Sequence, residues 1–269
     1  MKLKQIECNN FYMFSDLKMQ LIRTSIRKNS KIIIDNIIQN HIQLNRAVIN
    51  NLELCMFCGS TINITKEHVL ARWVFNKSTK GFFITDINGL SQTYNRTTIP
   101  ACSHCNSNLL NGLEKYIQKL FEITFNKQAF PQVQVANIIR WLEIIDYKFQ
   151  VLNAIRRFKV SRTAGYNSYF ADLPLSVLRK SIHYSSSKAI AEIRRSQKRI
   201  TIKNKAKNIN SLITFKTKNQ GFHFFHQMDD FIFLELPKQQ IALFYFYRRI
   251  FDTEISAYEE SMKIIKTFY

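Results

Sequence analysis

The sequence predicts an α+β protein with N-terminal helices, a small cysteine-centred module, and a C-terminal domain of helices and antiparallel sheet. Three observations predict it. Apolar residues recur at spacings of three and four through residues 1–50 and in several stretches after residue 106. Two C-x-x-C pairs lie between these helical regions, and after residue 200 the pattern changes to short β-branched and aromatic runs. We therefore expect three units, residues 1–50, 51–125 and 126–269.

The first unit is predicted to hold two helices, residues 15–29 and 30–51, because each apolar-periodic stretch begins at a serine that can cap a helix. The middle unit holds several glycines and the short β-rich run 81–87, which leaves room for a hairpin and a returning strand. A helix is expected to begin at Asn106. Its apolar stripe is formed by Leu109, Leu110, Leu113, Ile117 and Leu120.

The third unit is predicted to contain helices and an antiparallel sheet. The helices are expected at residues 135–158, 173–182, 186–195 and 252–268, the last with an acidic first turn that suits the helix dipole. The strands are expected at residues 199–204, 211–218, 221–227, 230–236 and 241–250. Turn-like residues separate three of these strands, as in hairpins. The tryptophans, Trp73 and Trp141, are expected in the core.

The charge balance indicates a polyanionic partner. The 269 residues include 39 Lys and Arg against 19 Asp and Glu, which gives a formal net charge of +20. Nucleic acid is the expected partner, because each phosphate that a cation neutralises releases condensed counterions. The alternative is compositional, since AT-rich coding produces a chain rich in Lys, Ile and Asn.

Composition argues against a disordered chain and against a membrane protein. Apolar residues make up 46% and aromatic residues 13% of the sequence, which is enough for a core. No apolar run reaches the roughly 18 residues that a membrane span needs. The first residues, MKLKQIECNNFYMF, lack the continuous apolar stretch of a signal peptide. A cytoplasmic location and no membrane partner are therefore expected.

Four of the five cysteines form two C-x-x-C pairs: Cys55 with Cys58, and Cys102 with Cys105. In a reducing compartment such pairs are typical of metal sites rather than disulfides. Four thiolates suit tetrahedral zinc, so a structural Zn²⁺ is predicted. His104 lies inside the second pair but is not needed as a ligand, and Cys8 is expected to be a small buried hydrophobe.

The residues around these cysteines follow a recognisable order. CMFCG at 55–59 is followed by KEHVLARW at 66–73 and by CSHCNSNLLNGLE at 102–114. This order resembles the HNH endonuclease family, the zinc-bearing branch of the ββα-metal nucleases, over about residues 51–116. The resemblance implies a treble-clef-like ββα-metal module in which zinc ties the start of a β-hairpin to the N-terminus of a helix.

The resemblance also implies roles for individual residues. His68 would be the general base that deprotonates the attacking water, since an imidazole with a pKa near about 6.5 accepts a proton at neutral pH. Glu67 and Asn106 match the positions of the family's metal ligands, and their oxygens suit Mg²⁺ or Mn²⁺. Asn95 is the nearest match to the asparagine that braces the hairpin loop.

Some positions depart from the family's pattern. Ala71 stands where many members have proline, Thr97 where the bracing asparagine usually lies, and Leu109 where a Lys or His often follows the helix asparagine. Asn108 or Asn111 could assist in place of that last residue.

A non-catalytic role also stays open for each site residue. His68 could be a structural histidine in a zinc-ribbon DNA-binding protein, Glu67 a surface acid, and Asn106 a helix cap, since asparagine is a preferred N-cap. His223 and His226 lie in an aromatic strand and are expected to be partly buried sheet residues rather than a second site.

The most basic stretch is RRSQKRITIKNKAK, residues 194–207, which holds seven cations and no acid. It is predicted to contact phosphates, which would position a nucleic acid without reading its bases. A solvated loop is the alternative. The cations are Arg194, Arg195, Lys198, Arg199, Lys203, Lys205 and Lys207.

The sequence therefore predicts a metal-dependent HNH endonuclease that hydrolyses phosphodiester bonds in one step, with DNA favoured over RNA. By resemblance, small nucleases of this kind act in bacterial or phage defence, restriction or homing, and a regulatory partner such as an ATPase would restrain the activity. Two alternatives stay open. One is an RNase that uses the same site, for example on tRNA, and the other is a zinc-stabilised nucleic-acid-binding protein without catalysis.

Overall fold

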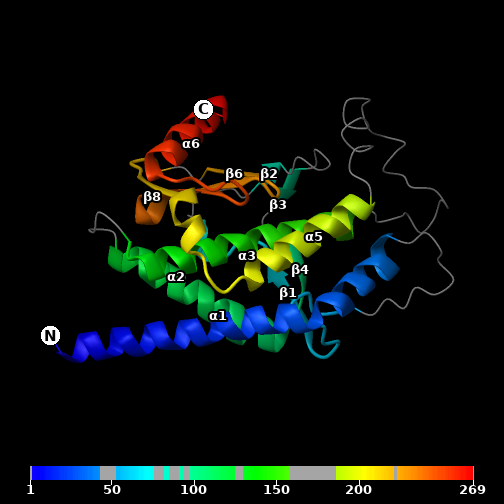
Figure 1. The fold of residues 1–269 in the computed structure, drawn as a ribbon. Helices are drawn as coiled ribbons and strands as arrows, with labels where there is room; N and C mark the ends of the chain where they lie inside the picture. Colours follow the sequence, from blue (N-terminus) through cyan, green and yellow to red (C-terminus); the bar gives the residue numbers. More distant parts are fainter. Residues whose placement is uncertain are drawn as a thin grey trace.

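A computed structural model describes residues 2–42, 53–75, 82–84, 91–93, 97–124, 130–157, 186–220 and 223–268. It combines helices with sheet, so the predicted α+β class is confirmed. Figure 1 shows the layers: α1 on one side, then α2, α3 and α5, then a four-stranded sheet, and finally α6. The helices are α1 (Lys2–Ile37), α2 (Asn111–Thr124), α3 (Gln132–Arg157), α5 (Ser186–Thr201) and α6 (Glu254–Phe268). The predicted helix at 173–182 lies outside the described residues.

Helix α1 is continuous where the sequence predicted two helices. It runs from Lys2 to Ile37 and ends in a π-helical turn, Ile38–Ile42. Ser30, predicted to cap a second helix, lies inside α1, and its hydroxyl donates a hydrogen bond of 2.6 Å to Gln197 Oε1 on α5. The prediction of a break was wrong because neither glycine nor proline interrupts the chain at the junction, and α5 supplies the partner for the serine hydroxyl.

The middle of the chain holds two antiparallel strand pairs. Strand β1 (Ile64–His68) pairs with β4 (Thr98–Cys102), and β2 (Phe82–Ile84) pairs with β3 (Ser91–Thr93). A 3-10 turn, Arg72–Val74, follows β1, and a π-helical segment, His104–Leu110, leads from β4 into α2. All five residues of the predicted apolar stripe on this helix are buried.

The C-terminal sheet has the strand order β5-β8-β7-β6, with all neighbours antiparallel. Alternate residues of its central strands face opposite sides: Leu234 and Leu243 join the main core, whereas Phe233 and Phe244 join a second cluster that includes Ala257 of α6. The sheet is therefore covered on both faces. Its strands are β5 (Leu212–Lys216), β6 (Phe224–Gln227), β7 (Phe231–Leu236) and β8 (Ile241–Phe246), and the 3-10 turns Ala206–Ser211 and Pro237–Gln239 flank it.

The strand predicted at 199–204 does not form, because α5 extends to Thr201. Ile193, Gln197 and Ile200 are all buried at a helical spacing on one face of α5. The helical apolar face thus continues through the first residues of the predicted strand, and packing against α1 and α3 favours the helix there.

Helix α3 lies at the centre of the protein, between the other helices and the sheet (Figure 1). Every residue from 141 to 154 is buried. Trp141 stacks on Trp73 with ring centroids 5.5 Å apart, which places both tryptophans as the sequence predicted. Residues from all three predicted units contribute to one continuous core. None of the described helices combines the length and the hydropathy that crossing a bilayer needs.

The turn that holds the first cysteine pair depends on Gly59. Its φ is +71°, and an added Cβ would lie 2.8 Å from Ile32 Cγ2 on α1. The left-handed backbone and the contact with α1 both oppose a side chain, so Gly59→Ala should lower the free energy of unfolding by about 2 kcal/mol. Denaturant unfolding monitored by circular dichroism measures this change.

Gly112→Ala is the matched control, because Gly112 lies in α2 and the added methyl meets only the flexible end of Lys18. The steric cost of this contact to the free energy of unfolding should be offset by the higher helix propensity of alanine, which is worth about 1 kcal/mol. Equal destabilisation by the two changes would show that the Gly59 turn carries no special constraint.

Candidate functional site

The four paired cysteines gather in one cluster. Their sulfur atoms all lie within 4.8 Å of one another, so the cluster could hold a metal ion such as zinc. Cys55 and Cys58 come from the turn before β1, Cys102 ends β4, and Cys105 lies in the π-helical segment. The cluster thereby joins three parts of the middle unit. Hydrogen bonds from backbone N–H groups shape it: Gly59 N donates to Cys55 O at 2.9 Å, and Cys105 N donates to the side-chain sulfur of Cys102 at 3.4 Å.

The electrostatics of the cluster fit a cation. A hydrogen bond from the Cys105 thiol lowers the pKa of Cys55 to about 5, so this thiol ionises first. Burial, followed by the charge on Cys55, raises the pKa of Cys58 to about 12. The pKa of Cys105 is also raised, by its hydrogen bond to Cys55 and by burial. Ionisation of all four thiols is therefore disfavoured here without a cation, and a divalent ion such as zinc would supply the compensating charge.

Asn106 lies against strand β1. Its amide nitrogen donates to Thr65 Oγ1 at 2.9 Å and to Lys66 O at 3.3 Å. Thr65 in turn donates to Ala101 O across the β1–β4 pair at 2.8 Å. The amide oxygen of Asn106, the atom that a hard cation would bind, has no hydrogen bond to a described residue. Asn106 thus fits a metal-ligand role as well as a bracing role.

Glu67 points into the interior, where only 6% of it is exposed. Its carboxylate forms an ion pair with Lys148 of α3, and the same ammonium donates to His68 O at 3.0 Å and lies 3.4 Å from Glu114 Oε1 on α2. Burial disfavours the ammonium, but the two carboxylates raise the pKa of Lys148 above its ordinary value. Burial raises the pKa of Glu114 to about 7. Glu67 is therefore not a plain surface acid.

His68 ends strand β1 and is half-buried. Burial and the charge of the exposed Arg72 lower its pKa, whereas Glu67 opposes that shift. The ring is therefore neutral at neutral pH. Among the described residues, the hydrogen bonds of Asn106 go to Thr65 and Lys66 and the ion pair of Glu67 goes to Lys148, so no hydrogen bond or ion pair joins the two predicted metal ligands. Asn95 lies outside the described residues.

Two residues that sequence reasoning missed lie next to this site, Glu114 and Lys148. Glu114 ends the quoted motif CSHCNSNLLNGLE without an assigned role, and Lys148 is the lone cation in the apolar stretch IIDYKFQVL of α3. A lysine at the centre of a buried helix requires a carboxylate partner. From that requirement a carboxylate partner for Lys148 could have been predicted, but the sequence does not identify which acid it is.

Three described histidines, His104, His223 and His226, take no part in the cysteine cluster. His104 is exposed, and its Nδ1 lies 3.3 Å from Asn108 Nδ2, so four cysteines form the cluster without it. His226 lies in β6, 3.1 Å from Asp146 Oδ1, and His223 lies 2.6 Å from Glu235 Oε2. Both are held by carboxylates of the fold. The side chain of Cys8 is outside what the structure describes.

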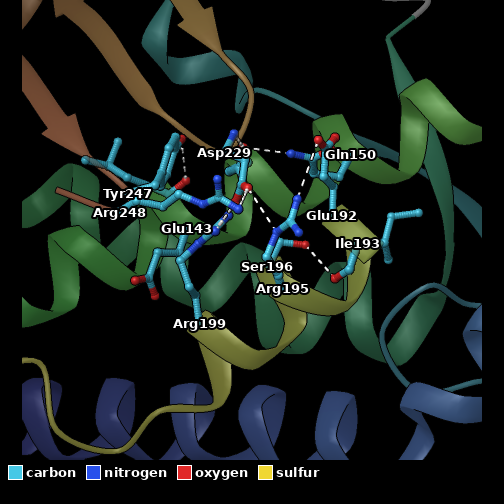
Figure 2. A network of polar contacts seen from close by, with 12 residues as sticks. Glu143, Gln150, Glu192, Ile193, Arg195, Ser196, Arg199, Asp229, Tyr247 and Arg248 are labelled. Atoms are coloured by element: carbon cyan, nitrogen blue, oxygen red, sulfur yellow. Dashed lines mark hydrogen bonds and ion pairs between the residues drawn. The ribbon is translucent and has the colours of Figure 1, made fainter. Parts of the chain in front are cut away.

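The basic stretch 194–207 divides into exposed and internal cations. Arg199 pairs with Asp146 and Asp229, and Lys205 pairs with Glu143 at 2.7 Å. Figure 2 shows Arg195, Arg199 and Arg248 converging on Asp229. The two internal cations, Arg199 and Lys205, hold α5 and the segment after it to α3. Those left exposed for phosphate contact are Arg194, Lys198, Lys203 and Lys207, with Arg195 partly so.

Comparisons with protein-family models, with curated proteins and with solved structures found no match. The similarity to HNH endonucleases thus rests on the order of residues in the sequence. The structure adds a four-cysteine cluster that could hold a metal ion, in a mixed helix-and-sheet fold.

Removing one cysteine of the cluster tests the metal centre. Cys58→Ser should lower the zinc content from about one ion per chain and should lower the thermal unfolding midpoint by roughly 5 °C or more. Inductively coupled plasma mass spectrometry and calorimetry measure the two effects. Cys8→Ser is the control and should change neither. Unchanged zinc content in Cys58→Ser would contradict the assignment.

A double-mutant cycle tests the Glu67–Lys148 pair. Lys148→Met should lower the free energy of unfolding by roughly 3–5 kcal/mol, because it leaves a buried carboxylate unpaired. Combining it with Glu67→Gln should cost less than the sum of the single changes, by about 0.5–3 kcal/mol. The exposed pair of Lys31 and Asp35 on α1 is the control, and Lys31→Met should cost no more than about 0.5 kcal/mol. Strict additivity at Glu67 and Lys148 would contradict the pairing.

Proposed function

We propose that the chain is a metal-dependent nuclease of the HNH type that hydrolyses phosphodiester bonds, with DNA favoured over RNA. One observation carries the proposal. The four-cysteine cluster joins the turn before β1, the end of β4 and the helical segment that bears Asn106, and β4 pairs with β1, which bears Glu67 and His68. Asn106, distant in the sequence, donates hydrogen bonds to Thr65 and Lys66 of that same strand.

Within this proposal each residue has a distinct task. His68 takes the proton of the water that attacks the phosphorus. Asn106 offers its amide oxygen, and Glu67 its carboxylate, to Mg²⁺ or Mn²⁺. When bound, this ion stabilises the negative charge that develops on the phosphate. Lys148 positions Glu67, because its ammonium pairs with that carboxylate. Glu114 in turn helps to hold Lys148, because its carboxylate lies beside the same ammonium.

A second candidate is a zinc-stabilised nucleic-acid-binding protein without catalysis. The ion pair between Glu67 and Lys148 favours it, because an ammonium already neutralises the carboxylate that a catalytic metal would need. In the nuclease proposal, Lys148 must share or release Glu67 when the metal binds. The two candidates therefore differ in whether divalent cations activate cleavage.

His68→Ala separates them. With Mg²⁺ or Mn²⁺, the zinc-loaded wild-type protein should nick supercoiled plasmid, and His68→Ala should slow nicking by at least about 100-fold, since general-base catalysis contributes that much. Gel electrophoresis of time points measures both rates. His104→Ala, an exposed histidine outside the cluster, is the control and should cleave at the wild-type rate.

Total RNA treated in parallel identifies an RNase acting through the same site. Nicking by His68→Ala at the wild-type rate would show that His68 is not the base. A wild-type protein that binds plasmid and RNA but cleaves neither would support the non-catalytic candidate.

A further inference from the structure

We propose that a basic groove formed by α1, α3 and the segment after α5 binds the phosphate backbone of a nucleic acid. The groove has a volume of about 980 Å³. Its cations come from three parts of the chain: Arg23 and Arg27 from α1, Arg140 from α3, and Lys203 and Lys205 from the segment after α5. This inference rests on the nucleic-acid partner of the proposed function and requires no cleavage.

No acidic residue is among the described residues that line the groove. Burial, followed by the charges of Arg140 and Arg27, lowers the pKa of Arg23, and the charge of the nearby Glu143 opposes that shift. Arg23, Arg27 and Arg140 thus lie close enough together to repel one another. Like charges gathered in this way are unfavourable until an anion neutralises them. A chain of phosphates supplies several negative charges at once and therefore fits the groove.

Backbone carbonyls hold the arginines in place. Arg27 donates to Thr201 O at 2.8 Å and Arg23 to the same oxygen at 3.4 Å, while Arg140 donates to Lys203 O at 2.6 Å. These carbonyl oxygens belong to uncharged peptide groups, so they orient the guanidinium groups without neutralising the positive charge. Each guanidinium has five N–H donors, which leaves donors for phosphate oxygens after one bond to a carbonyl.

Lys205 has a different part in the groove. Its ammonium donates to Glu143 and to Arg199 O, both at 2.7 Å, and it is buried. It therefore fixes the wall and does not meet the phosphate. Arg27 and Lys203 are exposed and reach the ligand.

Two further exposed cations lie close to the groove segment in the sequence. Lys198 and Lys207 precede and follow the groove segment in the sequence, and both are exposed. A ligand that extends past the groove would meet further cations, which favours a polymer backbone over a single nucleotide.

The test compares two double variants with the same net charge. Arg27→Gln with Lys203→Gln removes two exposed groove cations, and Lys238→Gln with Lys263→Gln removes two exposed cations elsewhere. Fluorescence anisotropy with zinc-loaded protein and no added Mg²⁺ measures binding to a labelled DNA duplex and to RNA of the same sequence. Salt is varied between about 50 and 200 mM.

The groove variant should bind at least about tenfold more weakly than wild type, and its salt slope on duplex DNA should fall by nearly 2, because each lost phosphate contact removes about 0.9. The control variant should bind like wild type. Arg27→Lys with Lys203→Arg keeps both charges and should retain binding. Weakening on DNA alone, or on RNA alone, identifies which polymer occupies the groove.

Equal weakening by the groove and control variants would overturn the proposal, because binding would then follow net charge alone. Unchanged binding in the groove variant would overturn it as well. The groove proposal and the nuclease proposal can fail separately. If the wild-type protein does not cleave but the groove variant loses binding, the groove proposal stands and the nuclease proposal fails. If the wild-type protein cleaves and the groove variant binds like wild type, the nuclease proposal stands and the groove proposal fails.

Discussion

Helix α3 runs through the centre of the protein, and each charge that it carries there must be neutralised. A buried charge without a partner costs several kcal/mol. The partners come from three different parts of the chain, so the pairs connect α3 to the middle unit, to α5 and to the segment after α5. The pairs are Lys148 with Glu67, Asp146 with Arg199, and Glu143 with Lys205. The positions of both the candidate site and the groove therefore depend on this one helix.

In the nuclease proposal, the same constraint would place stability and catalysis in competition at Glu67. The carboxylate is the partner that Lys148 requires, and a catalytic cation would use it as a ligand. Glu114 would relieve this conflict in part, because it lies 3.4 Å from the ammonium and could hold it if Glu67 turned to a metal. A second carboxylate beside Lys148 would thus let one acid serve both roles.

Local patterns in the sequence predicted what depends on local chemistry. Cysteine spacing located the four-cysteine cluster that could hold a metal ion, and short β-branched and aromatic runs located the strands from β5 to β8. What failed depends on tertiary contacts. Ser30 resembles a helix cap until α5 supplies a partner for its hydroxyl, and Arg199 resembles a phosphate ligand until Asp146 and Asp229 surround it. Composition cannot show which cation faces inward. For the same reason it could not assign Lys148 to Glu67, nor bring Arg23 and Arg140 into one groove.

The distribution of the acids explains how a net charge of +20 leaves exposed basic residues around the groove. Several of the 19 acidic residues are buried as partners of internal cations, including Glu67, Glu143, Asp146 and Asp229. Each buried acid neutralises a cation inside the fold and leaves one fewer carboxylate outside to screen the exposed lysines and arginines. Because Glu143 holds Lys205 in the wall, the groove keeps its shape while Arg27 and Lys203 stay exposed. Neutralisation inside the protein and positive potential outside it are consequences of the same placement of acids.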